Sequence, residues 1–275
     1  MKTILACLTT EEHTPDILAA ALPLARRKNS HLIGLHTLEA LAIYPGIWMH
    51  VPEDIYIDFS ESQEATSDAI REAFENRVRT EDFVWEWRGV KAQSMTAADR
   101  MVDAARTSDL VIMAQADETA DRADQYHAQE HVIRQSGRPV LHVPRGFRGE
   151  NVGSSVVIGW SLSREAARAV HDALPLMEPG SKAWIVTVAQ GETRAYDGAT
   201  ELARALDRHG IEAEVVQRTA EKPHIAKVLQ AEALERGADL IVTGAFGHSR
   251  LYDFVVGAVT LELMRDATVP VLFSR

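Results

Sequence analysis

The chain has 275 residues, of which 46% are hydrophobic and 25% charged, and its formal net charge is −11. This length suits two globular domains, and the acidic balance argues against nucleic acid or an anionic membrane as a partner. Cys7 is the single cysteine, so no intrachain disulfide forms, and no apolar run is long enough to span a membrane. We therefore expect a cytoplasmic protein.

The first half alternates short apolar runs with segments of helical periodicity. Strands are predicted near residues 4–8, 32–36, 83–87, 110–114 and 140–143. Helices are predicted from an N-cap at Thr14, over 63–79, from a capping box at Thr96 and near 129–135. Strands that alternate with helices indicate a parallel sheet covered on both faces.

The second half repeats this order. Its predicted strands are 156–160, 184–188, 213–217, 240–243 and 269–273, and its predicted helices start at Ser163, cover 199–208 and 223–237, and run from 257 to 265. Asp109-Leu-Val-Ile-Met-Ala114 returns as Asp239-Leu-Ile-Val-Thr-Gly244. Such a repeat predicts two tandem domains, residues 1–146 and 154–275. We expect each to hold a five-stranded parallel sheet of order 3-2-1-4-5, and the two to pair within the chain about a pseudo-two-fold axis. Whether two chains associate further stays open.

The two halves differ by an insertion near residues 39–62 of the first domain. The segment mixes aromatic residues such as Tyr44 and Trp48 with acidic ones. A long loop in a compact domain is often functional, so a lid or subunit contact and a simple surface loop are both open interpretations.

A set of glycines follows the fourth strand of the second half and is missing from the corresponding part of the first half. Gly244-x2-Gly247-x9-Gly257 follows the fourth strand of the second half and precedes its last helix. Glycine turns let an anion approach the backbone, and the start of a helix attracts phosphate oxygens. In an order 3-2-1-4-5 these groups lie at the crevice between strands one and four, where Ser161 also ends strand one. The pattern predicts a phosphate-binding site.

This motif, together with Trp160-Ser-Leu-Ser163 and Val269-Pro-Val-Leu272, resembles the universal stress protein family. The resemblance covers both halves and implies a tandem member of that family. It further implies that the C-terminal half binds ATP or a related adenine nucleotide, with a divalent cation such as Mg²⁺. The sequence departs from the family pattern at two positions, because Ala258 stands where Ser or Thr is usual and Ser161 stands near the usual Asp.

The expected nucleotide-binding residues lie around the three glycines. They are Ser161, Gly244, Gly247, His248, Ser249, Arg250, Gly257, Ala258, Val259 and Thr260. In the first half, Tyr126 and His127 stand at the positions of Gly257 and Ala258, and Asp117 stands at the position of Gly247. A carboxylate there repels phosphate, so we expect the N-terminal site to be degenerate.

Three functions follow from these patterns. The first is a stress-linked sensor or regulator that binds an adenine nucleotide and is no enzyme beyond slow ATP hydrolysis. The second is a nucleotide-free interaction scaffold of the same fold, whose protein partner is unknown. The third is a zinc hydrolase that uses His127, Glu130 and His131, since His-x-x-Glu-His places two imidazoles one helical turn apart.

Overall fold

The computed structural model describes residues 1–39, 53–93, 95–116, 122–149, 151–188, 193–218, 224–247 and 257–275. In the N-terminal half the strands are β1 (Thr3–Cys7), β2 (His31–Leu38), β3 (Trp85–Lys91), β4 (Leu110–Ala114) and β5 (Val140–Val143). The helices of this half are α1 (Thr14–Lys28), α2 (Glu53–Val78), α3 (Ala97–Ala105) and α4 (Arg122–Gln135).

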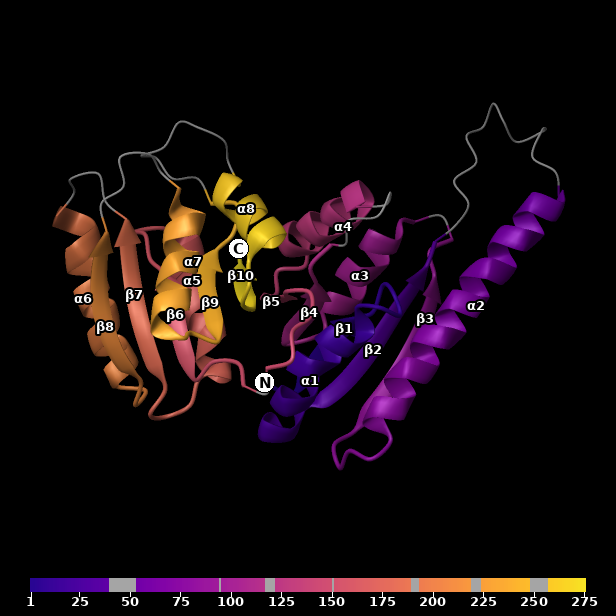
Figure 1. Ribbon diagram of the computed structural model, residues 1–275, viewed down its shortest axis with the longest axis horizontal. Coiled ribbons are helices and arrows are strands. Elements are labelled where there is room, and N and C mark those ends of the chain that lie inside the picture. Colours follow the sequence, from indigo (N-terminus) through magenta and orange to yellow (C-terminus); the bar gives the residue numbers. More distant parts are fainter. Residues whose placement is uncertain are drawn as a thin grey trace.

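The C-terminal half has the same succession of elements. Its strands are β6 (Ser155–Gly159), β7 (Lys182–Val188), β8 (Glu212–Arg218), β9 (Leu240–Gly244) and β10 (Val271–Ser274). Its helices are α5 (Arg164–Ala173), followed by a 3₁₀ turn (Leu174–Leu176), then α6 (Thr193–Asp207), α7 (Ile225–Arg236) and α8 (Ala258–Asp266). Figure 1 shows the two halves side by side, the N-terminal one in indigo to magenta and the C-terminal one in orange to yellow.

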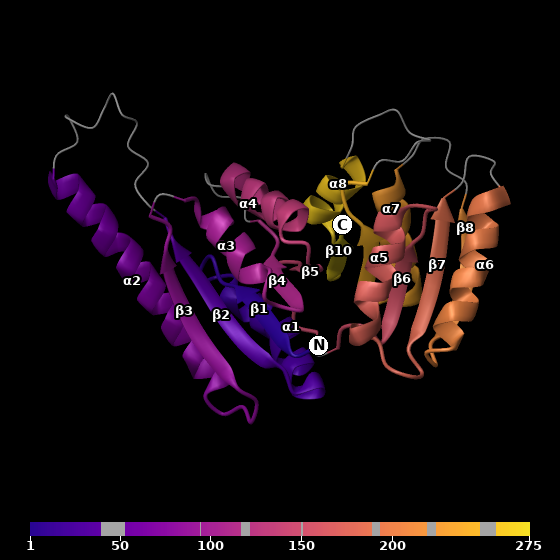
Figure 2. The same cartoon turned by 180° about the vertical axis from the view of Figure 1, so that it is seen from behind.

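All described strands belong to one sheet of order β3-β2-β1-β4-β5-β10-β9-β6-β7-β8. Each half therefore has the predicted order 3-2-1-4-5. Strands within each half are parallel, and the halves join where β5 and β10 pair antiparallel, with Leu141 opposite Leu272. The expected pairing of the two units within the chain is thus a continuous sheet. Figure 2 shows the same seam from behind, with α2 and α6 at the two outer edges.

The helices cover both faces of the sheet, as predicted. One apolar core packs α1, α2, α5 and α6 against one face, with Ile17, Phe74 and Val170 among its buried residues. A second core packs α3, α4, α7 and α8 against the other face, with Met101 and Leu263 buried in it. Neither core stops at the seam, so burial of apolar surface stabilises both halves together. Within the described ranges, none of the helices has the length and apolar content that a bilayer span requires.

The repeated aspartate has the same role in both halves. Asp109 accepts hydrogen bonds from the backbone N–H groups of Lys2 and Thr3 at the start of β1. Asp239 accepts them from Gly153, Ser154 and Ser155 at the start of β6. The sequence repeat therefore preserves a carboxylate that binds the amide groups of the neighbouring strand.

Two helix caps are confirmed and one is wrong. The side chains of Thr96 and Ser163 cap α3 and α5 as predicted. Thr14 lies inside α1 instead, and its hydroxyl donates to the carbonyl of Thr10 at 2.8 Å. His13 is the N-cap of α1 and makes no capping hydrogen bond through its side chain.

Three helices begin earlier than predicted, and one of them is α6, which starts at Thr193 instead of residue 199. Helix α2 starts at Glu53, inside the insertion expected near 39–62, because acidic residues such as Asp54 favour the first turn of a helix. Helix α4 starts at Arg122, because the glycine that precedes α8 is replaced by Tyr126 and nothing interrupts the helix there. Residues 40–52 of the insertion, with Tyr44 and Trp48, lie outside the described residues.

Candidate functional site

Gly244 ends β9 at a point where the start of α5 approaches the strand. A Cβ at Gly244 would lie 2.7 Å from the backbone nitrogen of Ala166 and 2.7 Å from the carbonyl carbon of Glu165. These are backbone atoms of the first turn of α5, which cannot move aside alone. Glycine is therefore required here for packing, in addition to any role toward a ligand.

Gly247 lies beside the carboxylate of Glu165. A Cβ at Gly247 would lie 3.0 Å from Glu165 Oε2. The other oxygen, Glu165 Oε1, accepts a hydrogen bond of 2.6 Å from Arg164 Nε. Burial raises the pKa of this carboxyl, but the hydrogen bonds from Arg164 and other neighbours outweigh burial, so the pKa lies below its ordinary value. Glu165 is thus a carboxylate at neutral pH and places a negative charge beside the glycine turn.

Phe246 fixes the turn between these two glycines. Its φ is 50°, in the left-handed region that a residue with a Cβ rarely adopts. Its ring is buried, and its backbone N–H donates to the hydroxyl of Thr260 at 3.2 Å. The preceding amide, Ala245 N–H, donates to the carbonyl of Ser274 at the end of β10. Thr260, one of the predicted nucleotide-binding residues, is buried, and its hydroxyl stabilises the turn.

Gly257 precedes α8 in a left-handed conformation, with φ at 97°. A Cβ there would lie 2.8 Å from the ring of Phe246, so this glycine also packs against the first turn of the motif. Among the described residues, no side chain caps α8. The N–H groups of Ala258, Val259 and Thr260 are in the first turn, where a helix supplies no internal acceptor. Within the described residues, this helix start therefore offers backbone amide groups of the kind that bind anions.

Ser161 lies in the loop between β6 and α5, at the end of the first strand of the second half, as predicted. It is exposed, and its hydroxyl donates to Ser163 Oγ at 3.2 Å. Phe246 lies in the turn between Gly244 and Gly247, and it contacts Gly257 and Thr260. These four predicted residues are therefore close together. His248, Ser249 and Arg250 lie outside the described residues.

Two residues near the glycines were missed by the sequence analysis. Glu165 follows the predicted cap Ser163, and its place in the first turn of α5 was a signal that it lies at the same edge of the sheet. Arg134 belongs to α4 of the N-terminal half, and its guanidinium carbon lies 3.7 Å from the centroid of the Phe246 ring. Because this contact crosses the seam between the halves, the local sequence around the glycines could not reveal it.

The corresponding region of the N-terminal half is closed by side chains. Gln129 is buried, and its amide donates to the carbonyl of Ala114 at 2.8 Å. Its carbonyl oxygen lies 3.1 Å from His142 Nε2. The backbone N–H groups near Tyr126 and His127 are inside α4 rather than at its start. The amide groups that would receive a phosphate in this half are therefore used by the helix itself.

The His-x-x-Glu-His residues make other contacts. His131 Nε2 lies 3.0 Å from a carboxylate oxygen of Asp99, and Glu130 accepts a 2.7 Å hydrogen bond from Arg134. The rings of His127 and His131 are stacked with their centroids 6.4 Å apart. In the part of the chain that the structure describes, no group of three or more His, Cys, Asp or Glu side chains is arranged to hold a metal ion. A zinc hydrolase finds no support in this arrangement.

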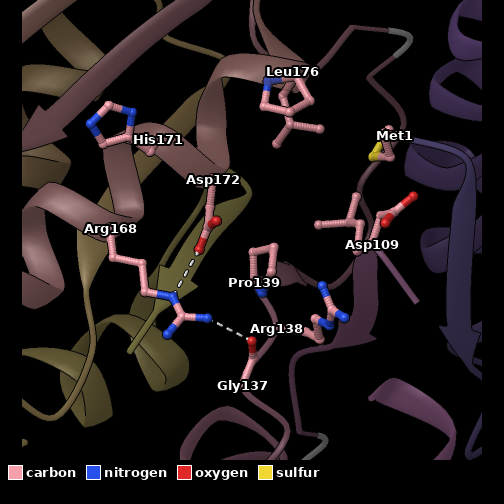
Figure 3. Close-up of a pocket in the computed structure, with 11 residues that line it drawn as sticks. Met1, Asp109, Gly137, Arg138, Pro139, Arg168, His171, Asp172 and Leu176 are labelled. Atoms are coloured by element: carbon pink, nitrogen blue, oxygen red, sulfur yellow. Dashed lines mark hydrogen bonds and ion pairs between the residues drawn. The ribbon is translucent and has the colours of Figure 1, made fainter. Parts of the chain in front are cut away.

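A small cavity of about 220 Å³ lies on the seam between the halves, away from the glycines (Figure 3). Arg168 of α5 crosses it and donates to the carbonyl of Gly137 at 2.7 Å. Arg138 on the other wall donates to the carbonyl of Arg106 at 3.1 Å. Because both guanidinium groups already bind backbone carbonyls, this cavity is part of the packing between the halves.

The fold and the glycine turns define a class of protein: a tandem α/β protein whose second half carries glycine turns at the end of its fourth strand. Residues 154–275 match the model of the universal stress protein family. A universal stress protein from Synechocystis sp. is 25% identical over 179 residues, which make up 61% of this chain and only 58% of that relative. Both comparisons thus relate the chain to universal stress proteins, the family model through its C-terminal half.

Solved structures show the same fold along the whole chain. A universal stress protein from Archaeoglobus fulgidus DSM 4304 has a TM-score of 0.73 at 18% identity, with 98% of this chain and 96% of that chain covered. The cytoplasmic domain of a prokaryotic cation chloride cotransporter has a TM-score of 0.50 at 12% identity, with 99% and 94% covered. At such identities the likeness concerns the fold, and it extends through the N-terminal half.

Proposed function

We propose that the C-terminal half binds ATP or a related adenine nucleotide, and that the protein acts as a stress-linked sensor or regulator. The observation that carries this proposal is the start of α8. Gly257 is left-handed there, and no described side chain caps the helix. The free amide groups and the positive end of the helix dipole attract phosphate oxygens.

The choice of an adenine nucleotide rests on the family resemblance of the glycine motif. The amide groups themselves recognise phosphate and do not distinguish one base from another. Gly244 ends β9, Gly247 follows it, and Ser161 follows β6, the strand that pairs with β9. In sheets of this order, ligands bind beyond the carboxyl ends of these two strands. His248, Ser249, Arg250, Ala258 and Val259 complete the proposed binding residues.

Glu165 gives a physical reason for a divalent cation. Its carboxylate lies beside Gly247 and is ionised at neutral pH, so it would repel a bare triphosphate. Mg²⁺ is commonly bound by one or two carboxylates together with the phosphates of a substrate. We infer that Glu165 faces the cation that accompanies the nucleotide. It would replace the aspartate that is usual in the family near the position of Ser161.

The same proposal assigns different roles to two domains, 1–146 and 154–275. The second binds the nucleotide, and the first does not, because Gln129 and the long α4 use the groups that would receive a phosphate. The shared sheet makes the two domains one structural unit.

A melting experiment tests this function. A ligand that binds only the folded state raises its stability, by about 2.7 kcal/mol when the ligand is at 100 times its Kd. We expect a higher Tm in millimolar ATP with Mg²⁺ and a smaller shift with inorganic phosphate. An unchanged Tm in millimolar ATP with Mg²⁺ contradicts the proposal.

A nucleotide-free scaffold is the second candidate, and one observation favours it. Ile55 and Ile57 are about half exposed on the first turns of α2, in the inserted segment at the outer edge of the molecule (Figure 1). Two residues apart on a helix, these side chains point to different sides of α2, so a partner that encloses this end of the helix would cover both. This alternative predicts that the paired change Ile55→Asp and Ile57→Asp alters the mass measured by light scattering while ATP has no effect.

A further inference from the structure

Arg134 belongs to the N-terminal half but contacts the glycine motif of the C-terminal half. Its guanidinium carbon lies 3.7 Å from the centroid of the Phe246 ring, well inside the range of a cation–π contact. Its Nη2 atom lies 3.8 Å from the position that a Cβ on Gly257 would take. One side chain of α4 thus lies against both the turn after β9 and the start of α8.

Phe246 is the residue whose position decides the shape of this turn. It is a residue with a Cβ at positive φ, which persists only where the surroundings fix it. Three contacts fix it: the Thr260 hydroxyl on its N–H, Gly257 against the edge of its ring, and Arg134 over its face. The first two come from the C-terminal half, and Arg134 is the contribution of the other half.

Arg134 is itself held in place from both sides of the seam. Its Nε donates to Glu130 one turn earlier on α4, at 2.7 Å. Its backbone carbonyl accepts a 3.3 Å hydrogen bond from Arg275 after β10. Its side chain is only 27% exposed, so the guanidinium is a fixed group rather than a solvated surface charge.

We propose that Arg134 is a positioning residue, supplied by the N-terminal half, for the glycine turns of the C-terminal site. By holding Phe246, it holds the Gly244–Gly247 turn and the start of α8 in the arrangement that binds phosphate. The expected effect of Arg134 on nucleotide affinity rests on the proposed function. The expected effect of Arg134 on the turn does not depend on that function. Through Arg134, the N-terminal half would help to shape a site whose proposed binding residues all belong to the C-terminal half.

The structural part is tested on the nucleotide-free full chain by hydrogen exchange. Arg134→Met keeps an unbranched side chain and removes the cation. We expect amides in peptides covering 244–247 and 257–263 to exchange at least about fivefold faster, while β1 and β6 stay unchanged. Arg138→Met is the matched control, since Arg138 is also on the N-terminal side of the seam and donates to Arg106 in its own half. Unchanged exchange at both peptides in Arg134→Met overturns the proposal, and so does faster exchange spread equally over the whole chain.

The functional part is tested by a double-mutant cycle with Phe246→Leu, read as the Kd for ATP with Mg²⁺. Arg134→Met should weaken binding about five- to tenfold in the wild type, and less than about twofold in the Phe246→Leu background. Arg134→Lys should recover part of the loss, because it keeps the cation but not the planar stacking. If the factors by which the two substitutions raise the Kd multiply fully in the double mutant, Arg134 acts on the nucleotide directly and the positioning role is wrong. If the wild type binds no ATP, the proposed function fails, while the exchange experiment still decides the role of Arg134.

Discussion

The two halves share a scaffold and differ at one edge of it. Both have strands in the order 3-2-1-4-5, and both use an aspartate, Asp109 or Asp239, to bind the amides at the start of the first strand. They differ where the fourth strand ends. After β9 come glycine turns and a helix that starts at Ala258, whereas after β4 the helix α4 already starts at Arg122. An earlier helix start is enough to hide the amide groups that make an anion site.

The two halves also differ in the side chains near the end of the fourth strand. In the N-terminal half, Gln129 reaches back to the carbonyl of Ala114 and to His142. In the C-terminal half the corresponding Thr260 is shorter, and its hydroxyl accepts a hydrogen bond from the N–H of Phe246. The comparison teaches that a repeated α/β unit can keep its core while the end of its fourth strand and the next helix start differ.

Filling the position of Gly257 should have the largest effect. In Gly257→Val the side chain meets the Phe246 ring at 2.8 Å and is strained at φ 97°. We expect nucleotide affinity to fall about 100-fold, equivalent to about 2.7 kcal/mol. Gly180→Ala is the control, because Gly180 has a similar φ of 89° with nothing within 4 Å of its Cβ position. Equal Kd values for the two variants in calorimetry would remove Gly257 from the site.

Gly244→Ala tests the packing role of the motif separately from binding. Its Cβ would lie 2.7 Å from backbone atoms of α5, so we expect a loss of about 2–3 kcal/mol in the free energy of unfolding. The N-terminal half has alanine at the corresponding position, and Ala114→Gly should cost about 1 kcal/mol or less. Urea denaturation of both variants measures the difference, and equal losses speak against a distinct approach of α5 to β9.

His142 makes the seam between the halves sensitive to acid. Burial lowers its pKa to about 3 from the ordinary value of 6.5, so the folded protein keeps it neutral while the unfolded chain takes up a proton below pH 6.5. Stability from this residue is therefore complete above pH 6.5 and is lost as the pH falls toward 3, by about 2 kcal/mol at pH 5.

Replacing His142 by the residue at the matching position of β10 removes that proton site. His142→Phe copies Phe273, whose ring lies 6.1 Å from the imidazole across the seam. We expect the unfolding free energy of this variant to change less between pH 6.5 and 5 than that of the wild type, whatever its absolute stability. A slope equal to the wild-type slope would show that another group is responsible.

Glu165→Gln should have the smallest effect and the most specific one. Without the carboxylate beside Gly247, metal-free ATP should bind about threefold more tightly, because the repulsion is removed. The gain in affinity that Mg²⁺ brings should shrink by a similar factor. Titrations with and without Mg²⁺ give the ratio, and an unchanged ratio contradicts a cation at Glu165.

Periodicity and repeats were sufficient to predict the strands, the division into two similar halves and the caps at Thr96 and Ser163. These features depend on local patterning and on a repeated aspartate, which a single sequence displays. The early start of α4 was not predicted, because the missing glycine at Tyr126 was interpreted as a lost site and not as a continuing helix. The contacts of Glu165 and Arg134 depend on how α5 approaches β9 and on the β5–β10 seam. Both are long-range arrangements that no local spacing encodes.

Isothermal titration of the full chain with ATP and Mg²⁺ tests the central difference between the halves most directly. The account predicts one binding site per chain, lost in Gly257→Val and kept when Gln129 is changed to Ala in the N-terminal half. Two sites per chain, or binding that survives in Gly257→Val and disappears in Gln129→Ala, would contradict it.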